Sequence, residues 1–222
     1  CNQREARRMI VETYQSSVSP ARAIIGLHGW TGDEFSMQPV AKKLKIEESK
    51  WFMPRAPYDA DTGNGYTWFS GSDEEGWRYQ RTMDMMPRLL SEVAEEGFTA
   101  QETFLVGFSM GAGLALLTAA ALPYAIGGVI AIAGFVKNPD FLASLMTDES
   151  KATPIVIIQG SEDDIVTPER SKATFELLQS LGYDVRYEKY DTGHKVPADA
   201  ITLMRDFIKD EVPSMEKRVS MS

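Results

Sequence analysis

One serine is surrounded by the sequence features that a catalytic nucleophile requires. Ser109 occupies the centre of the pentapeptide GFSMG at residues 107–111, after the apolar run FLV at 104–106 and directly before an Ala- and Leu-rich segment. This order predicts a buried strand, a very tight turn and a helix, with the hydroxyl exposed at the turn and glycines that let strand and helix approach closely. We therefore predict that Ser109 is a nucleophile. The alternative is a chance G-x-S-x-G in a chain with 17 glycines.

A serine hydroxyl is a weak nucleophile at neutral pH and needs a base, and the chain contains two histidines. His194 ends the segment DTGH, which follows a predicted strand and lies downstream of the acidic segment SEDD at 161–164. An imidazole with a pKa of about 6.5 can accept the serine proton when an acidic side chain holds its tautomer. The order serine, acid, histidine along the chain is that of nucleophile-elbow hydrolases. We predict that His194 is the base; the alternative is a purely structural histidine.

Two backbone N–H groups are predicted to bind the oxyanion that forms when the serine attacks a carbonyl. In nucleophile-elbow enzymes one comes from the residue after the serine and the other from the loop after an early strand. Here these residues are Met110, at the start of the predicted helix, and Trp30, in the loop HGWTGD at 28–33. His28 begins the same loop. We interpret it as shaping that loop and also keep it as a candidate for substrate binding, a direct catalytic part being the alternative.

The strands and helices that must position these residues follow from hydrophobic periodicity. Residues 7–14 could form an edge strand, alternation predicts a strand at 183–187, and short apolar runs predict buried strands at 23–27, 51–53, 104–106, 128–133 and 154–158. Helical patterns cover 37–44, 86–93, 109–122, 167–181 and 201–208, and the third of these is apolar almost all round. Pro87 is expected in the first turn of its helix, with a kink in a longer helix as the alternative.

Strands that alternate with helices predict an α/β fold, a mostly parallel sheet with helices on both faces. At 222 residues the chain is expected to form one domain, with frayed ends at 1–6 and 212–222. About twenty residues separate the strands at 128–133 and 154–158, too few for a separate cap domain. The site is therefore expected to be an open cleft beyond the carboxyl ends of the strands.

Residues 55–78 show little regular pattern yet contain five aromatic residues. A structureless loop of this length is uncommon inside a domain and tends to be functional. We interpret it as a flap over a pocket, with Trp68 and Phe69 as candidates for substrate contacts. The alternatives are a surface loop pinned by its aromatic residues, or a dimer contact.

Composition excludes several classes of partner. The formal net charge of −9 argues against nucleic acid or an anionic membrane surface, and no apolar run approaches the roughly 20 residues of a membrane span. Cys1 is the single cysteine, so neither an intramolecular disulfide nor a cysteine-based zinc site is expected, and no cofactor or metal is predicted. We expect a cytoplasmic monomer or homodimer, with lipid anchoring through Cys1 as the alternative.

The motifs, taken together and in order, resemble those of the phospholipase/carboxylesterase group of α/β-hydrolases, which includes acyl-protein thioesterases. They are LHGWTGDE, PRAP, TWF, LVGFSMGAG, IQGSEDDIV and DTGH, and the resemblance spans about residues 22 to 208. It implies an α/β-hydrolase fold. The group's motif HG-x-x-D-x-x-V, laid on residues 159–166, selects Asp163 as the acid, with Glu162 and Asp164 as adjacent competitors.

The chain departs from the group at two positions. Met110 stands where glutamine is usual, and Trp30 stands where a small or aliphatic residue is common and could narrow the acyl site. The candidate residues and the resemblance together predict a metal-free serine hydrolase that cleaves small-molecule carboxylic esters or thioesters through an acyl-enzyme. The alternatives are an amide- or peptide-cleaving hydrolase with the same triad, and a catalytically silent member that binds a ligand or a protein.

Overall fold

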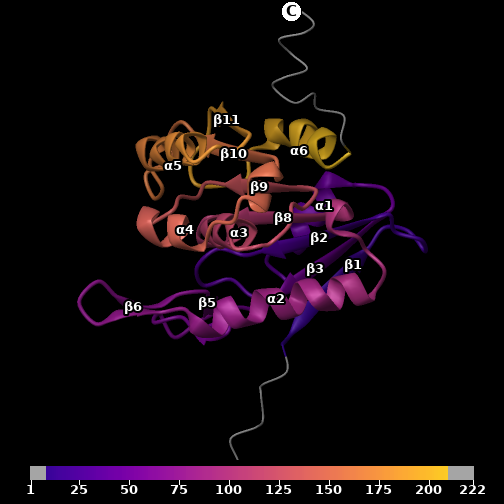
Figure 1. The fold of residues 1–222 in the computed structure, drawn as a ribbon, viewed down its shortest axis with the longest axis horizontal. Helices are drawn as coiled ribbons and strands as arrows, with labels where there is room; N and C mark the ends of the chain where they lie inside the picture. The colour runs from indigo at the N-terminus through magenta and orange to yellow at the C-terminus, as the bar shows by residue number, and fades with distance from the viewer. Residues whose placement is uncertain (1–8, 210–222) are drawn as a thin grey trace, which may run out of the picture.

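Seven strands form one central sheet in the computed structural model, which describes residues 9–209 (Figure 1). Their order across the sheet is β1 (Val11–Gln15), β3 (Ser49–Pro54), β2 (Arg22–Leu27), β8 (Thr103–Phe108), β9 (Gly128–Ile132), β10 (Ile155–Gly160) and β11 (Val185–Tyr190). All neighbouring pairs are parallel except β1 with β3. The mostly parallel sheet predicted from the apolar runs is confirmed, and β1 is the edge strand expected within residues 7–14, of which 7 and 8 lie outside the described range.

The alternation of side chains along each strand divides the core into two halves. Ile25 belongs to a cluster with residues of α2 (Gln80–Glu95), α3 (Met110–Ala120), α4 (Pro139–Leu145) and α5 (Pro168–Ser180). Its neighbour Ile24 packs instead with residues of α1 (Gln38–Leu44) and α6 (Ile201–Ile208). Both isoleucines are fully buried, and burying such a side chain contributes about 1.5–3 kcal/mol. Helices therefore cover both faces of the sheet, as predicted.

The connection between β9 and β10 is as short as the sequence indicates. It contains α4 and one 3₁₀ helix, Glu149–Ala152. The α4 helix starts after Asn138, whose side chain accepts a hydrogen bond from the N–H of Phe141. The connection thus continues the helical layer and adds no cap over the carboxyl ends of the strands.

Residues 55–78 are more regular than predicted. They form two small antiparallel hairpins, β4 (Tyr58–Asp59) with β5 (Tyr66–Thr67), and β6 (Ser70–Ser72) with β7 (Gly76–Arg78). The strands are only two or three residues long, which is too short for hydrophobic alternation to reveal. The hairpins depend on glycines with positive φ, among them Gly65 (φ 73°) and Gly71 (φ 117°), because other residues are strained in that region.

Pro87 lies in the interior of α2, so its predicted place in the first turn is wrong and the alternative of a longer helix holds. The helix begins at Gln80, and its buried stripe starts with Thr82. The Thr82 hydroxyl donates a 2.5 Å hydrogen bond to the carbonyl of Trp68, a long-range contact that extends the helix towards its N-terminus. Because proline has no N–H, the helix lacks the bond that would reach the Met83 carbonyl.

Several predictions made from the sequence concern the two ends of the chain. The frayed segments 1–6 and 212–222 and the proposed anchor at Cys1 all fall outside the described residues. Among the helices within residues 9–209, none is both long and apolar enough to cross a bilayer.

Candidate active site

Ser109 sits in a strained turn between β8 and α3. Its backbone has φ 54° and ψ −117°, a conformation that residues with a Cβ rarely adopt. Glycine is required on both sides, since a Cβ at Gly107 would lie 2.2 Å from the carbonyl oxygen of Gly111, and a Cβ at Gly111 would lie 2.2 Å from that of Leu27. The tight turn and the close approach predicted from the pentapeptide are therefore present.

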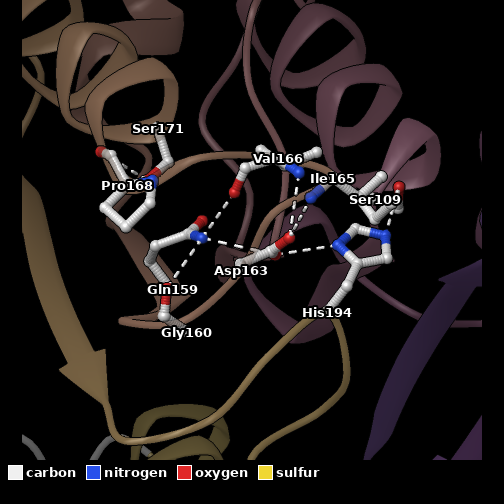
Figure 2. A network of polar contacts seen from close by, with 9 residues as sticks. All are labelled: Ser109, Gln159, Gly160, Asp163, Ile165, Val166, Pro168, Ser171 and His194. Atoms are coloured by element: carbon white, nitrogen blue, oxygen red, sulfur yellow. Dashed lines mark hydrogen bonds and ion pairs between the residues drawn. The ribbon is translucent and has the colours of Figure 1, made fainter.

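Three side chains that are far apart in sequence meet at this turn (Figure 2). The Oγ of Ser109 lies 3.0 Å from Nε2 of His194, and Nδ1 of His194 lies 2.8 Å from Oδ2 of Asp163. With the Nδ1 proton donated to the carboxylate, Nε2 is free to accept the proton of the serine hydroxyl. The residues follow β8, β10 and β11, whose carboxyl ends lie at one edge of the sheet because these strands run parallel.

The loop after β10 brings only one of its three acidic residues to His194. The side chain of Asp163 is 0% exposed, whereas Glu162 and Asp164 are exposed and make no hydrogen bond with His194 among the described contacts. The Oδ1 of Asp163 accepts hydrogen bonds from the backbone N–H groups of Ile165 (3.0 Å) and Val166 (2.9 Å). These bonds turn Oδ2 towards the imidazole, so the geometry agrees with the choice of Asp163 over its neighbours.

The two expected oxyanion donors belong to segments that adjoin the serine. Met110 is the first residue of α3, so its N–H has no partner within the helix and belongs to the positive end of the helix dipole. The loop of Trp30 passes directly beside Ser109, since a Cβ built on Gly29 would lie 3.4 Å from the Cβ of Ser109. The Trp30 side chain is 49% exposed. The oxyanion role of both N–H groups stays a prediction.

His28 and Trp68 occupy places that differ from those expected of substrate contacts, because they are only 1% and 0% exposed. The Nε2 of His28 accepts a hydrogen bond from the N–H of Ala56 (3.2 Å), and its Nδ1 donates to the carbonyl of Gly29 (2.7 Å). Burial lowers the pKa of His28, although the Gly29 carbonyl opposes this. A neutral ring with both nitrogens occupied fits the interpretation that His28 shapes the loop.

The segment 55–78 lies against the loop of Trp30 and the start of α3. The N–H of Tyr66 donates to the carbonyl of Gly32 (2.9 Å). The hydroxyl of Thr67 donates to the carbonyl of Phe69 (2.8 Å) and lies 3.2 Å from Sδ of Met110. Phe69 itself is half-buried. These contacts make the segment a wall beside Ser109, and its role as a flap, with Phe69 touching the substrate, stays a prediction.

A partly buried ion pair that the sequence reasoning missed holds the same loop. Arg55 donates to both carboxylate oxygens of Glu34, at 2.6 and 2.5 Å, and to the hydroxyl of Tyr66 at 3.1 Å. Glu34 is 4% exposed, and the hydrogen bonds from Arg55 lower its pKa. Sequence position shows only that Glu34 and Arg55 follow β2 and β3; the pairing becomes visible once the structure places these two parallel strands side by side.

Comparison with known proteins supports the family resemblance that the sequence motifs indicated. A sequence profile of the Phospholipase/Carboxylesterase family matches residues 9–212. Acyl-protein thioesterase 1 of Gibberella zeae is 26% identical over 206 residues, which cover 84% of this chain and 86% of the relative. A rice protein named a probable inactive carboxylesterase is 24% identical over 205 residues, covering 84% of this chain and 83% of the relative. Among solved structures, that of esterase PE8 aligns with a TM-score of 0.78 at 24% identity and covers 92% of this chain and 99% of its own.

Proposed function

Because this chain belongs to the phospholipase/carboxylesterase family of α/β-hydrolases, we propose that it is a serine hydrolase that cleaves carboxylic esters or thioesters through an acyl-enzyme. The family relationship supports a hydrolase of the esterase or thioesterase type. The proposal assigns the chemistry to Ser109 as nucleophile, His194 as general base and acid, and Asp163 as the group that orients His194. The observation that carries it is the unbroken hydrogen-bonded chain from Ser109 to Asp163.

In the acylation step, Oγ of Ser109 attacks the acyl carbon while its proton moves to Nε2 of His194. The imidazolium that forms is stabilised by Asp163 at 2.8 Å. The developing oxyanion is bound by the N–H groups of Met110 and Trp30, which replace solvent with fixed donors. Collapse of the tetrahedral intermediate breaks the bond to the alcohol or thiol, and the leaving group takes the proton from Nε2.

Deacylation repeats these steps with water as the nucleophile. His194 removes a proton from the water, the hydroxide attacks the acyl-enzyme, and the proton returns to Oγ of Ser109 as the acid is released. Ser109 is half-buried in the strained turn at the end of β8, and we expect water and substrate to reach its Oγ without passing a cap domain. The acyl group is expected to lie against the half-buried Phe69 and Met110.

The proposal is tested by labelling and turnover together. A fluorophosphonate probe should label wild-type protein at Ser109, and p-nitrophenyl esters of short acids should be hydrolysed. A protein that is neither labelled nor active would be a catalytically silent member of the family. Matched ester and anilide substrates separate an esterase from an amide-cleaving enzyme, and we expect the ester to be strongly preferred.

A further inference from the structure

The side chain of Gln159, near the end of β10, is fully buried and lies beside the acid of the proposed triad (Figure 2). Its Nε2 lies 2.8 Å from the carbonyl oxygen of Val166, 3.1 Å from that of Gly160 and 3.3 Å from Oδ2 of Asp163. All three acceptors belong to one loop: Gly160 begins it, Val166 ends it, and Asp163 supplies the carboxylate of the proposed triad. A single amide therefore ties that loop together at the point where it presents Asp163.

The neighbours of Gln159 determine which way its amide points. A reversed amide would place Oε1 against three oxygen atoms, none of which has a proton to donate while Asp163 is ionised. In the orientation present, Oε1 is buried and has no hydrogen-bond partner among the described residues. An unpaired buried acceptor is destabilising. The side chain is thus held by its N–H contacts. The amide has two N–H protons for these three acceptors, so one proton is shared, and the contact with Asp163 is the longest of the three at 3.3 Å.

The carboxylate of Asp163 is fully occupied by its donors. Oδ1 accepts the N–H groups of Ile165 and Val166, and Oδ2 accepts both Nδ1 of His194 and Nε2 of Gln159. A carboxylate offers about four lone-pair sites, so these donors leave it little freedom to rotate. Among the described contacts, Gln159 is the donor that limits movement of Oδ2 independently of His194.

We propose that Gln159 is a positioning residue whose amide N–H holds Oδ2 of Asp163 in line with Nδ1 of His194 and moderates the negative charge that the imidazole experiences. This role rests on the proposed function, because Gln159 acts only through Asp163. It also makes a distinctive prediction. Removing the N–H should change both the rate and the pH dependence of the reaction, whereas a general packing role would change stability alone.

The first test is Gln159→Met, which keeps a similar volume and removes the donor. We expect kcat to fall about tenfold with little change in KM, because a loosened Asp163 no longer fixes the imidazole. We also expect the acidic limb of kcat/KM to move to higher pH, because more negative charge on Oδ2 faces His194 and favours the imidazolium. The readout is the pH profile of p-nitrophenyl ester hydrolysis.

A second variant, Gln159→Glu, tests the same positioning role if the Gln159→Met variant does not fold. It keeps the shape of the side chain, and its carboxyl group can donate to Oδ2 only while protonated. We expect a new loss of kcat as the pH rises and the carboxyl ionises beside Asp163, since two adjacent carboxylates repel each other. A wild-type pH profile in either folded variant would overturn the proposal.

Two controls separate the possible explanations. Ser171→Ala removes another buried polar group nearby, which contacts the Pro168 carbonyl and the Tyr187 hydroxyl and makes no described hydrogen bond to Asp163. It should lower stability and leave the pH profile unchanged; the same shift in this variant would overturn the positioning role. Ser109→Ala, measured in parallel, tests the triad itself. Full activity there would end the proposed function, whereas its loss beside an unaffected Gln159→Met would end only the role of Gln159.

Discussion

The indole N–H of Trp68 donates a 2.8 Å hydrogen bond to the backbone carbonyl of His28, and the two rings lie 4.8 Å apart. This contact joins the segment 55–78 to the loop that carries Trp30, one of the expected oxyanion donors. Trp68, which was predicted to touch the substrate, is instead a buried support for the loop of Trp30. The consequence can be measured.

Trp68→Phe keeps an aromatic ring and removes the N–H, which leaves the buried carbonyl of His28 without this donor, and the smaller ring also leaves a cavity at this fully buried position. We expect the free energy of unfolding to fall by about 1–3 kcal/mol and kcat to fall because the loop of Trp30 is less firmly held. Urea denaturation and ester turnover provide the two measurements. Trp77→Phe is the control for the same substitution at a surface position, since Trp77 is 37% exposed and its indole N–H donates to the surface residue Asp73. Equal losses of stability in both variants would contradict a special role for the Trp68 contact.

Ser109→Ala should lower kcat/KM for a p-nitrophenyl ester by roughly 10⁴-fold or more, because the remaining groups cannot form an acyl-enzyme. The overall fold should survive, since the serine hydroxyl contacts only His194 among the described hydrogen bonds. Ser161→Ala is a suitable control: Ser161 lies at the same edge of the sheet and donates to Asp191, outside the proposed triad. Turnover should stay within about twofold of wild type in that control. Undiminished turnover in Ser109→Ala would refute the assignment of the nucleophile.

Glu34→Gln should destabilise the protein at neutral pH by about 2 kcal/mol, because it weakens a pair whose carboxylate is buried and leaves the partly exposed Arg55 without its counter-charge. Arg55 lowers the pKa of Glu34, so the stabilisation is present above the ordinary value of about 4.5 and is lost as the pH falls through the folded-state pKa. The difference between wild type and variant, measured by urea denaturation, should therefore shrink in acid. Asp148→Asn, at an exposed pair with Lys151, should show little difference at any pH. A Glu34→Gln effect that does not change with pH would contradict this explanation.

The imidazole of His28 should titrate below pH 6.5, since burial disfavours its charged form. Because its pKa is lower in the folded than in the unfolded state, His28 has no effect on stability above about pH 6.5 and reduces stability as the pH falls below that value. NMR can follow the ring directly, since the chain has two histidines and His194→Gln identifies the other signal. A midpoint at or above 6.5 would show that the ring is not held neutral by burial.

Local features of the sequence determined the strained turn at Ser109 and the layers of the fold. The spacing of glycines around Ser109 predicts the tight turn because the steric limits that require glycine act over a few residues. The apolar runs predict the parallel sheet for the same reason, since burial on both faces is recorded in each strand separately. The short hairpins in 55–78 were not predicted because their strands are only two or three residues long. The interior place of Pro87 was not predicted because the bond from Thr82 to Trp68, which helps to fix the start of α2, is a long-range contact.

Tertiary structure alone decided which side chains within the segments predicted to be functional face one another. The residues of SEDD are chemically similar, and Asp163 is turned towards His194 by N–H groups of its own loop. Trp68 is buried and Glu34 is paired with Arg55 because parallel strands place the ends of distant segments side by side. A sequence pattern records the periodicity and turn chemistry of one segment, whereas the partner of a side chain depends on where another segment ends, and only the folded sheet determines that.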